Sequence, residues 1–467
     1  MDNFKCKNCS NPCKIFECLQ NDLDLDKEDL RDDMVKSIYH KAEEISEVTV
    51  SKNSSKQYML DTRLDNLFTS KFTGYPIMFI LLGLIFWITI AGANVPSSIL
   101  ADMFFFIEDK ITNVFMYLNA PNWLHGILVL GVYRTLAWVV SVMLPPMAIF
   151  FPCFTLLEDL GYLPRVAFNL DRLFKKAGAH GKQALTMTMG FGCNAAGIIA
   201  CRIIDSPRER LIAMITNNFV PCNGRFPTLI MISSIFIGAV VSSTYSSLFA
   251  SFFVAFLVVI GILITLLVSW GLSKTMLKGV PSSFTLELPS YRKPKIGHII
   301  YTSLIDRTIF VLSRAIVVAI PAGLVTWILA NINVGDQSIL ALFASNLDPF
   351  ARLIGLDGFI LMAFILGLPA NEIVLPILIM SYMSEGAMLE LDSLQAMGDL
   401  FRANGWTTLT ALNVMLFSLL HFPCGTTLWT MKKECGSVKW TMVATLIPTT
   451  IAIITCFIVT QVAHILF

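Results

Sequence analysis

Two apolar stretches of the chain are interrupted by similar sets of polar and helix-breaking residues. The first interruption is GFGCN at residues 190–194, and the second is GLPANE at residues 367–372. A Pro-Cys pair follows each of them, at residues 221–222 and at residues 423–424. Polar and ionisable groups are costly inside a bilayer, and matched helix breaks in two halves of a membrane protein mark substrate or ion paths. The pattern therefore predicts a transport site.

The side chains in these segments can bind a soft or borderline metal ion. Cysteine sulfur prefers cations such as ferrous iron, zinc or cuprous copper over calcium or magnesium. Asparagine adds an amide oxygen, and Glu372 adds a carboxylate inside an apolar stretch. The predicted ion path consists of Cys193, Asn194, Cys222, Asn371, Glu372 and Cys424. The predicted helix-breaking backbone of the path consists of Gly190, Gly192, Gly367 and Pro369.

Taken singly, each of these residues also has a purely structural interpretation. A lone membrane cysteine is more often a small packing residue, and glycine and proline are common in membrane helices without a role in transport. A glutamate in an apolar stretch is harder to explain by packing alone. The functional interpretation therefore rests on the repetition of the pattern and on Glu372.

The composition indicates that membrane helices position these residues. The chain has 467 residues, of which 55% are hydrophobic and 14% charged, and its mean hydropathy is +0.68. A soluble domain carries about 25% charged residues. Apolar runs of spanning length lie at 75–93, 122–144, 226–242, 248–272, 308–331, 359–383, 406–431 and 440–466. We therefore expect an all-α polytopic membrane protein in which residues 75–467 form a transmembrane permease domain.

The two interruptions belong to an internal duplication. Gly190 and Asn194 match Gly367 and Asn371 at a constant offset of 177 residues (367 minus 190). Basic loops, which favour the cytoplasmic side, lie at 158–183, 202–210, 273–307 and 432–439. Acidic loops at 94–121, 332–358 and 384–405 are expected outside. Because an odd number of predicted spans separates the two breaks, we expect two inverted repeats with re-entrant or broken helices, at about 123–245 and 308–431.

Residues 1–74 are polar and are expected to form a cytosolic N-terminal segment, with a helix near 23–48 and no secretory signal. Cys6, Cys9, Cys13 and Cys18 cluster there with C-x2-C-x3-C-x4-C spacing. Four cysteines can hold zinc or an iron–sulfur centre, but the spacing matches no common zinc module, so a reducible tail is the equal alternative. The loop Gly181-Lys182-Gln183 lacks the remaining residues of a phosphate-binding loop, so no bound nucleotide is expected.

Several short motifs give the chain a specific resemblance. They are LEDLGY at 157–162, GFGCN at 190–194, DSPRER at 205–210, PCNGR at 221–225, ELPSY at 287–291, ANEIV at 370–374 and ECGSVKW at 434–440. From about Asp61 to its end, the chain resembles the membrane domain of FeoB-type ferrous iron transporters.

The resemblance implies an iron(II) permease of the cytoplasmic membrane with two gate repeats and a cytoplasmic N-terminus. It makes Cys193, Cys222 and Cys424 family candidates for the ion path, with Fe²⁺ as the transported substrate. The family's GTP-binding domain is not recognisable, and Ala195-Ala196 stands where the family has Val-Pro, which removes a helix breaker. We therefore expect a non-enzymatic subunit that works with a separately encoded GTPase and a small cytosolic accessory protein.

The sequence leaves other partners and functions open. A homo-oligomer is compatible with the pattern, and nucleic acid is not expected as a partner. The alternatives are a transporter of another divalent metal, a transporter of a nucleoside-like solute on the same fold, and a non-transporting membrane regulator. A membrane thiol oxidoreductase is a weaker alternative, because the membrane part contains no C-x-x-C pair.

Overall fold

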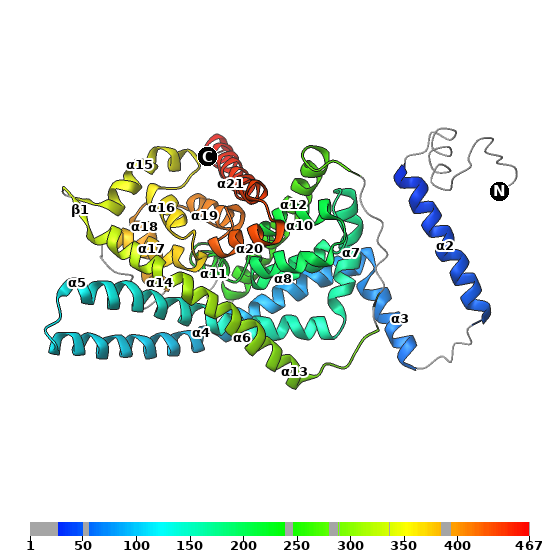
Figure 1. Cartoon of the computed structure of the whole chain (residues 1–467), viewed down its shortest axis with the longest axis horizontal. Helices are drawn as coiled ribbons and strands as arrows, with labels where there is room; N and C mark the ends of the chain where they lie inside the picture. The colour runs from blue at the N-terminus through cyan, green and yellow to red at the C-terminus, as the bar shows by residue number, and fades with distance from the viewer. Residues whose placement is uncertain are drawn as a thin grey trace.

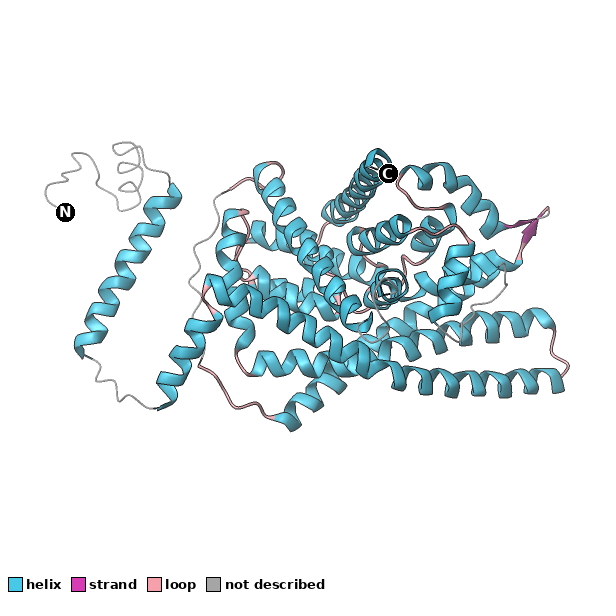
Figure 2. Ribbon diagram, turned by 180° about the vertical axis from the view of Figure 1, so that it is seen from behind, coloured by secondary structure: helices cyan, strands magenta, loops and turns pink. Residues whose placement is uncertain are grey.

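A computed structural model describes residues 27–49, 56–238, 246–279, 288, 290–335, 337–383 and 394–466. In this part of the chain almost every residue lies in a helix (Figures 1 and 2). Turns and loops join the helices, and the strands of the described residues form one small antiparallel ribbon, in which β1 (Asn333–Val334) pairs with β2 (Gln337–Ser338). The all-α prediction is confirmed.

The long helices account for the membrane-spanning part. The described residues contain six helices long and apolar enough to cross a bilayer, or up to seven if one bent pair counts as a span. They are built from α4 (Lys71–Tyr117), α5 (Asn122–His125), η1 (Gly126–Tyr133), α6 (Arg134–Asp159), α12 (Ser246–Lys274), α13 (Ile296–Tyr301), η6 (Thr302–Ile309), α14 (Phe310–Asn331), α19 (Thr408–Leu420), α20 (Gly425–Cys435) and α21 (Val438–Leu466). The prediction of a polytopic membrane protein is confirmed.

Shorter helices fill the space between these spans. In the first half they are α7 (Tyr162–Lys176), α8 (Gln183–Gly192), α9 (Asn194–Ala200), η2 (Cys201–Ile203), α10 (Pro207–Thr216), η3 (Asn217–Phe219), α11 (Phe226–Ile232) and η4 (Ser233–Ile237). In the second half they are α15 (Ile339–Leu353), α16 (Gly358–Leu366), η7 (Asn371–Ile373), α17 (Val374–Met383) and α18 (Leu394–Ala403). Two N-terminal helices, α2 (Lys27–Thr49) and α3 (Lys56–Phe68), precede the bundle, and α2 stands apart from it in Figure 1.

The duplication expected from the sequence recurs in the helices. Each half begins with a π-helical segment of eight residues, η1 or η6, that continues directly into α6 or α14. The helices α7 and α15 each have 15 residues, and each is followed by a glycine with φ of +70°, Gly178 or Gly355. L-residues rarely adopt this left-handed conformation, which explains glycine at both turns. The matched order of π-helix, α-helix and glycine turn shows two copies of one structural unit.

The first helices of the two repeats run antiparallel to each other. Near one end, the ring of Trp327 lies against Gly126, and Gly323 lies against Thr135. Near the other end, Ser303 donates a hydrogen bond of 2.9 Å to Thr155. As residue numbers rise in one helix they fall in its partner, so the second repeat is inverted relative to the first. Glycines at the crossing let the two backbones approach closely.

One part of the predicted topology is wrong. Residues 94–121 were expected to form an external loop, but α4 continues as helix to Tyr117. The acidic residue that favoured a loop, Glu108, is buried and forms an ion pair with Arg134. Tyr133 also donates to the carbonyl of Phe104 at 3.0 Å. These contacts with η1 and α6 pair the charge of Glu108 and hold α4 against its neighbour as a continuous helix.

An aromatic core links α4 to α8. The rings of Phe86 and Phe226 lie 4.8 Å apart, and those of Phe150 and Phe154 lie 5.0 Å apart. Phe154 in turn lies 5.9 Å from Phe191, near the end of α8. This buried cluster holds the first interrupted helix against the bundle.

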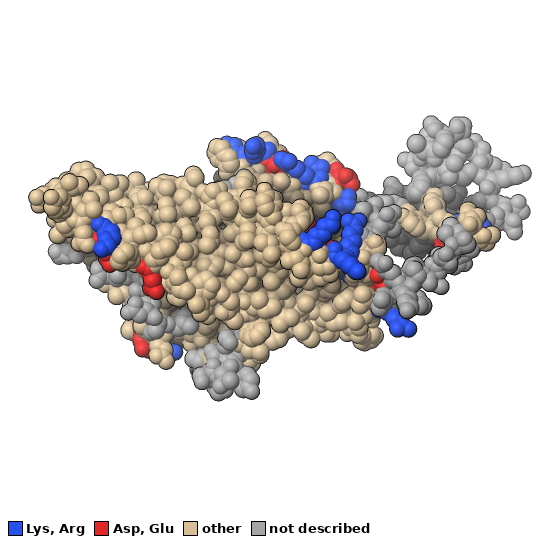
Figure 3. All heavy atoms as spheres, turned by 90° about the horizontal axis from the view of Figure 1, so that it is seen from below, with Lys and Arg blue, Asp and Glu red and all other residues tan. Residues whose placement is uncertain are grey.

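The outer surface has the distribution of charge expected of a membrane protein. Figure 3 shows a face whose middle is largely free of charged side chains. Lysine and arginine side chains gather mainly in the half of that face that also carries the N-terminal helices. A wide uncharged belt between charged ends is the surface that a bilayer requires.

Candidate functional site

Both predicted interruptions are breaks of the helix with nearly the same backbone conformation. Cys193 separates α8 from α9 with φ −153° and ψ 126°. Ala370 separates the turn after α16 from η7 with φ −150° and ψ 117°. A single extended residue inside a helical segment exposes helix ends within the protein, where they need partners or line a path. The prediction of broken helices is confirmed at both positions.

The residue after each break is a buried asparagine. Asn194 is 2% exposed and Asn371 is 4% exposed. Within the described part of the chain, neither side-chain amide oxygen has a hydrogen-bond partner. Most buried polar atoms in proteins do have one, so an unpaired pair at equivalent positions requires an explanation. Both oxygens are available to accept a donor or to bind a cation.

Each Pro-Cys turn closes onto the break of its own repeat. The backbone amide of Asn223, directly after Cys222, donates to the carbonyl of Gly192 at 3.3 Å. In the second repeat the amide of Gly425, directly after Cys424, donates to the carbonyl of Leu368 at 2.7 Å. These bonds satisfy backbone groups that the breaks leave without helical partners. They also place each Pro-Cys cysteine beside the break.

Contacts between the repeats bring the two breaks together. The side-chain amide of Asn371 donates to the sulfur of Cys222 at 3.9 Å. The carboxylate of Glu372 lies against Gly224 so closely that a β-carbon at that position would collide with it. Cys222 and Gly224 belong to the first Pro-Cys turn, which is itself hydrogen-bonded to Gly192 beside Cys193. The structure therefore places the predicted path residues of both repeats in one region.

These groups do not form a coordination sphere in this conformation. Among the described residues, no three side chains of His, Cys, Asp or Glu lie together as metal ligands. Cys193 and Cys424 are partly exposed, whereas Cys222 is buried. The two breaks therefore offer thiol, amide and carboxylate groups that do not come together as one closed metal site among the described residues.

A buried arginine that the sequence analysis did not select holds the two repeats together at the site. Arg225 is 1% exposed and donates to the carbonyls of Asn218 and Leu419, each at 2.8 Å. It also donates to the carbonyls of His421 and Phe422, each at 3.1 Å. Because these carbonyls come from both repeats, Arg225 ties the first Pro-Cys turn to the segment before the second. The sequence feature that could have identified Arg225 is its position in the PCNGR motif, which begins with the first Pro-Cys pair.

The glycines of the first break have a different role from the expected one. Gly190 and Gly192 lie within α8, and the helix is interrupted at Cys193 instead. A β-carbon on Gly190 would lie 2.9 Å from the amide oxygen of Asn217, and one on Gly192 would collide with Phe151. These glycines therefore permit close packing. Gly367 caps α16 and is followed in the break by Pro369, as predicted.

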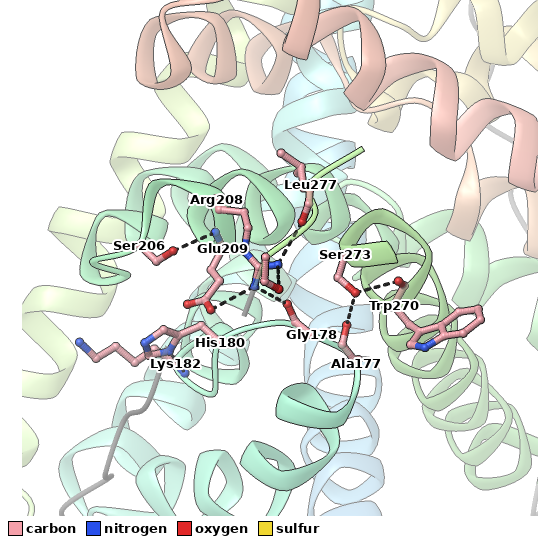
Figure 4. A network of polar contacts seen from close by, with 11 residues as sticks. Ala177, Gly178, His180, Lys182, Ser206, Arg208, Glu209, Trp270, Ser273 and Leu277 are labelled. Atoms are coloured by element: carbon pink, nitrogen blue, oxygen red, sulfur yellow. Dashed lines mark hydrogen bonds and ion pairs between the residues drawn. The ribbon is translucent and has the colours of Figure 1, made fainter. Parts of the chain in front are cut away.

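A polar network at the basic end of the first repeat fixes the helices that carry the site (Figure 4). Ser206 caps α10 by accepting a bond from the amide of Glu209 at 3.5 Å. Arg208 donates to the carbonyls of Leu277 and Gly178, at 3.0 Å and 3.2 Å. It thereby joins the chain after α12 to the turn between α7 and α8. The DSPRER motif is thus a structural joint.

The N-terminal cysteine cluster, Cys6, Cys9, Cys13 and Cys18, lies outside the described residues. Its proposed metal site stays a prediction from sequence.

Two family models match the chain. The one described as Gate, nucleoside recognition, matches residues 140–236 and again 312–438. The one described as ferrous iron transport protein B C terminus matches residues 254–306. The double match of one model agrees with the two structural repeats.

Curated relatives match nearly the whole chain. The protein named Fe(2+) transporter FeoB from Staphylococcus aureus (strain MSSA476) is 29% identical over 434 residues, which cover 90% of this chain and 61% of the relative. Its namesake from Campylobacter jejuni is 28% identical over 425 residues, covering 87% of this chain and 66% of the relative. A protein from Porphyromonas gingivalis, named a fusion of Fe(2+) transport protein A with FeoB, is 25% identical over 89% of this chain and 53% of its own length.

The chain thus spans about three fifths of the length of its first relatives. No solved structure matches the chain. The family models, the relatives and the paired broken helices agree on one assignment. The chain is similar to FeoB-type transporters over the part of their length that it matches, and its two Gate matches coincide with its two structural repeats.

Proposed function

We propose that this chain conducts ferrous iron across the cytoplasmic membrane, along a path lined by the residues at the two breaks. The observation that carries the proposal is the pair of buried amide oxygens without partners among the described residues, on Asn194 and Asn371, at breaks that also hold three thiols and one carboxylate. This mixture of soft and hard ligands suits a borderline cation such as Fe²⁺. The printed names of the relatives, Fe(2+) transporter FeoB, support the same substrate.

The two ends of the proposed path differ in chemistry. The first break presents the thiol of Cys193, and the second break presents Ala370 at the equivalent position. The second break in turn presents Glu372 where the first has Ala195. If the basic loops face the cytosol, the carboxylate receives the ion from outside and the thiols pass it inward. Residues 1–74 then lie in the cytosol, and the gate repeats extend over about 123–245 and 308–431.

The path must open for an ion to pass. In this conformation Arg225 bridges carbonyls of both repeats directly beside the cysteines. A buried guanidinium bound to carbonyls is stable only while those partners stay together. Movement of one repeat against the other therefore has to keep or replace these bonds. We propose that Arg225 acts as the pivot of the two repeats.

By family analogy, we propose that a GTPase and a small cytosolic accessory protein assist transport through this chain. The fusion protein from Porphyromonas gingivalis, whose name joins Fe(2+) transport protein A to FeoB, supports an accessory partner. The basic end of the molecule, at α7 and the following turn, is the surface on which such partners would act.

Flux measurements on the purified protein test the proposal. Sealed proteoliposomes with an inward metal gradient should take up Fe²⁺. Parallel measurements with Mn²⁺ and Zn²⁺ determine the metal selectivity of uptake. We expect Cys193→Ala, Cys222→Ala, Cys424→Ala and Glu372→Gln each to reduce uptake. The matched control is Cys456→Ala, a buried cysteine on α21 away from the breaks, which should leave uptake unchanged.

Two outcomes would contradict the proposal. Undiminished iron flux in all four variants would show that the ion does not pass along the proposed path. Uptake of a nucleoside that is indifferent to metal chelators would instead favour the solute implied by the description of the Gate family model.

A further inference from the structure

A cavity leads away from the first break toward the basic end of the molecule. It has a volume of about 120 Å³, and Cys193, Met189 and Thr188 line it together with Glu158 and Arg307. A single buried water needs only about 10–15 Å³ on this measure, so the cavity can hold several. Its walls come from α6 and α8 of the first repeat and from η6 and α14 of the second. It therefore lies at the interface between the repeats.

An ion pair occupies one part of this cavity. Arg307 donates to the carboxylate of Glu158 at 2.8 Å. The side chain of Glu158 is 41% exposed and that of Arg307 is 29% exposed. The thiol of Cys193, by contrast, belongs to the interrupted helix inside the bundle. The cavity thus connects a partly exposed carboxylate with the thiol of the proposed path.

The ion pair can separate without leaving the arginine unsatisfied. Arg307 also donates to the hydroxyl of Thr155 at 3.1 Å, and Ser303 donates to the same hydroxyl at 2.9 Å. A partly exposed ion pair contributes little to stability, because water screens it. A divalent cation that reaches Glu158 therefore competes with Arg307 at small cost.

The segment that lies beside the cavity indicates which side of the membrane the cavity faces. Asp159 accepts a bond from the backbone amide of Lys295 at 3.4 Å, so the end of α6 lies beside the basic segment that precedes α13. Loops rich in lysine and arginine favour the cytosolic side. The exposed part of the cavity consequently faces the cytosol in the proposed orientation.

We propose that this cavity is the cytosolic vestibule of the ion path. Glu158 binds the divalent cation after it leaves Cys193, and Arg307 occupies that carboxylate while no cation is present. The inference rests on the proposed function, because it assigns an exit site to the same path. It adds a second cation site, at the carboxylate of Glu158, that the two breaks do not contain.

Chemical labelling of Cys193 tests the vestibule without measuring flux. The probe is the membrane-impermeant cationic reagent (2-trimethylammonium)ethyl methanethiosulfonate, added to either side of sealed vesicles, and labelling is quantified on the peptide that contains Cys193. We expect labelling from the side of the basic loops. Arg307→Gln should accelerate it by about threefold or more, because removing the positive charge relieves repulsion of the reagent and opens the ion pair.

Divalent ions and matched variants complete the test. Mn²⁺ should slow labelling in the unmodified protein and have a smaller effect in Glu158→Gln. Arg307→Lys keeps the charge and should label at nearly the original rate. The control is Arg202→Gln, which removes an ion pair with Glu434 outside the cavity and should not change labelling.

The outcomes separate the vestibule from the transport function. Labelling only from the opposite side, or rates that ignore Arg307 and Glu158, would overturn the vestibule even if iron flux is intact. Absent iron flux with the expected labelling pattern would overturn the proposed substrate and leave the vestibule standing.

Discussion

Asn194 and Asn371 occupy equivalent positions in the two repeats, and each carries a buried amide oxygen that has no hydrogen-bond partner among the described residues. Each directly follows an extended residue, Cys193 or Ala370, at a break in the helix. An unpaired buried acceptor costs free energy that selection normally removes. The proposed ion path assigns these two acceptors a role, because a transported cation would bind them in passing.

The first prediction concerns these oxygens. Asn194→Ala and Asn371→Ala should each lower iron uptake by about tenfold, because a cation ligand contributes energy comparable to a charge-assisted hydrogen bond. Neither variant loses a hydrogen bond of its amide oxygen, so Asn194→Ala should keep its thermal stability. Asn371→Ala should lose only the weak 3.9 Å bond to Cys222. Uptake and melting temperature are measured on the same preparations.

Asn413 is the matched control for this prediction. Its side-chain amide donates to Thr460 at 2.8 Å, between α19 and α21. Asn413→Ala should lower stability by about 1 kcal/mol and leave uptake intact. The same loss of stability in the Asn194 and Asn371 variants would show that their role is structural.

The second prediction tests the contact between Glu372 and Gly224. Gly224→Ala should destabilise the protein by about 1–3 kcal/mol, because the added β-carbon collides with the carboxylate. Combining it with Glu372→Ala should recover most of that loss, because the shorter side chain removes the collision. A double-mutant cycle on melting temperatures measures the coupling. Additive effects of the two changes would contradict the contact.

The third prediction concerns Arg225. Arg225→Met should destabilise the protein by about 3 kcal/mol or more, because it leaves several buried carbonyls without donors. Arg225→Lys should restore only part of the stability, since an ammonium group lacks the planar fork that reaches all of them. Arg202→Gln, at an arginine that is 63% exposed, should change stability by less than about 0.5 kcal/mol. Equal losses of stability in the Arg225 and Arg202 variants would show that Arg225 does not hold the two repeats together.

The fourth prediction is a pH dependence outside the membrane spans. Burial lowers the pKa of His180 below its ordinary value of 6.5, although the nearby carboxylate of Glu209 opposes this shift. The unfolded chain then binds a proton at a higher pH than the folded one. The contribution of His180 to stability is therefore present above about pH 6.5 and is lost as the pH falls toward the lowered pKa.

Unfolding of His180→Gln gives the comparison for this prediction. The difference in melting temperature between the original protein and the variant should change between about pH 6.5 and 5, in the direction of a less stable original protein at low pH. A difference that stays constant over this range would show that His180 titrates equally in both states.

Local patterns were sufficient to predict the breaks. Gly367 and Pro369 mark the second one, and apolar runs on either side identify the helices that it interrupts. The error at 94–121 has a tertiary cause, because the ion pair of Glu108 with Arg134 joins residues that are 26 positions apart. An acidic loop and a helix with a buried acidic residue can have the same residue composition, so composition alone does not distinguish them.

The sequence predicted candidate residues for the site but not the contacts between them. Cys222 and Asn371 are 149 positions apart in sequence, and only the folded chain places them 3.9 Å apart. Gly190 and Gly192 were expected to unwind the helix, but the close approach of Asn217 and Phe151 explains them. Such approaches depend on which helices pack together, which a sequence of residue types does not specify.

The sequence by itself determined that this is a polytopic helical membrane protein with two repeats, because hydropathy, glycine and proline act over a few neighbouring residues. It also determined which thiols, amides and carboxylates are available for the ion. The tertiary structure decided the rest. Packing alone sets the distances between separate segments. Examples are the contact of Glu372 with Gly224, the bonds of Arg225 to carbonyls of both repeats, and the cavity lined by Cys193 and Glu158.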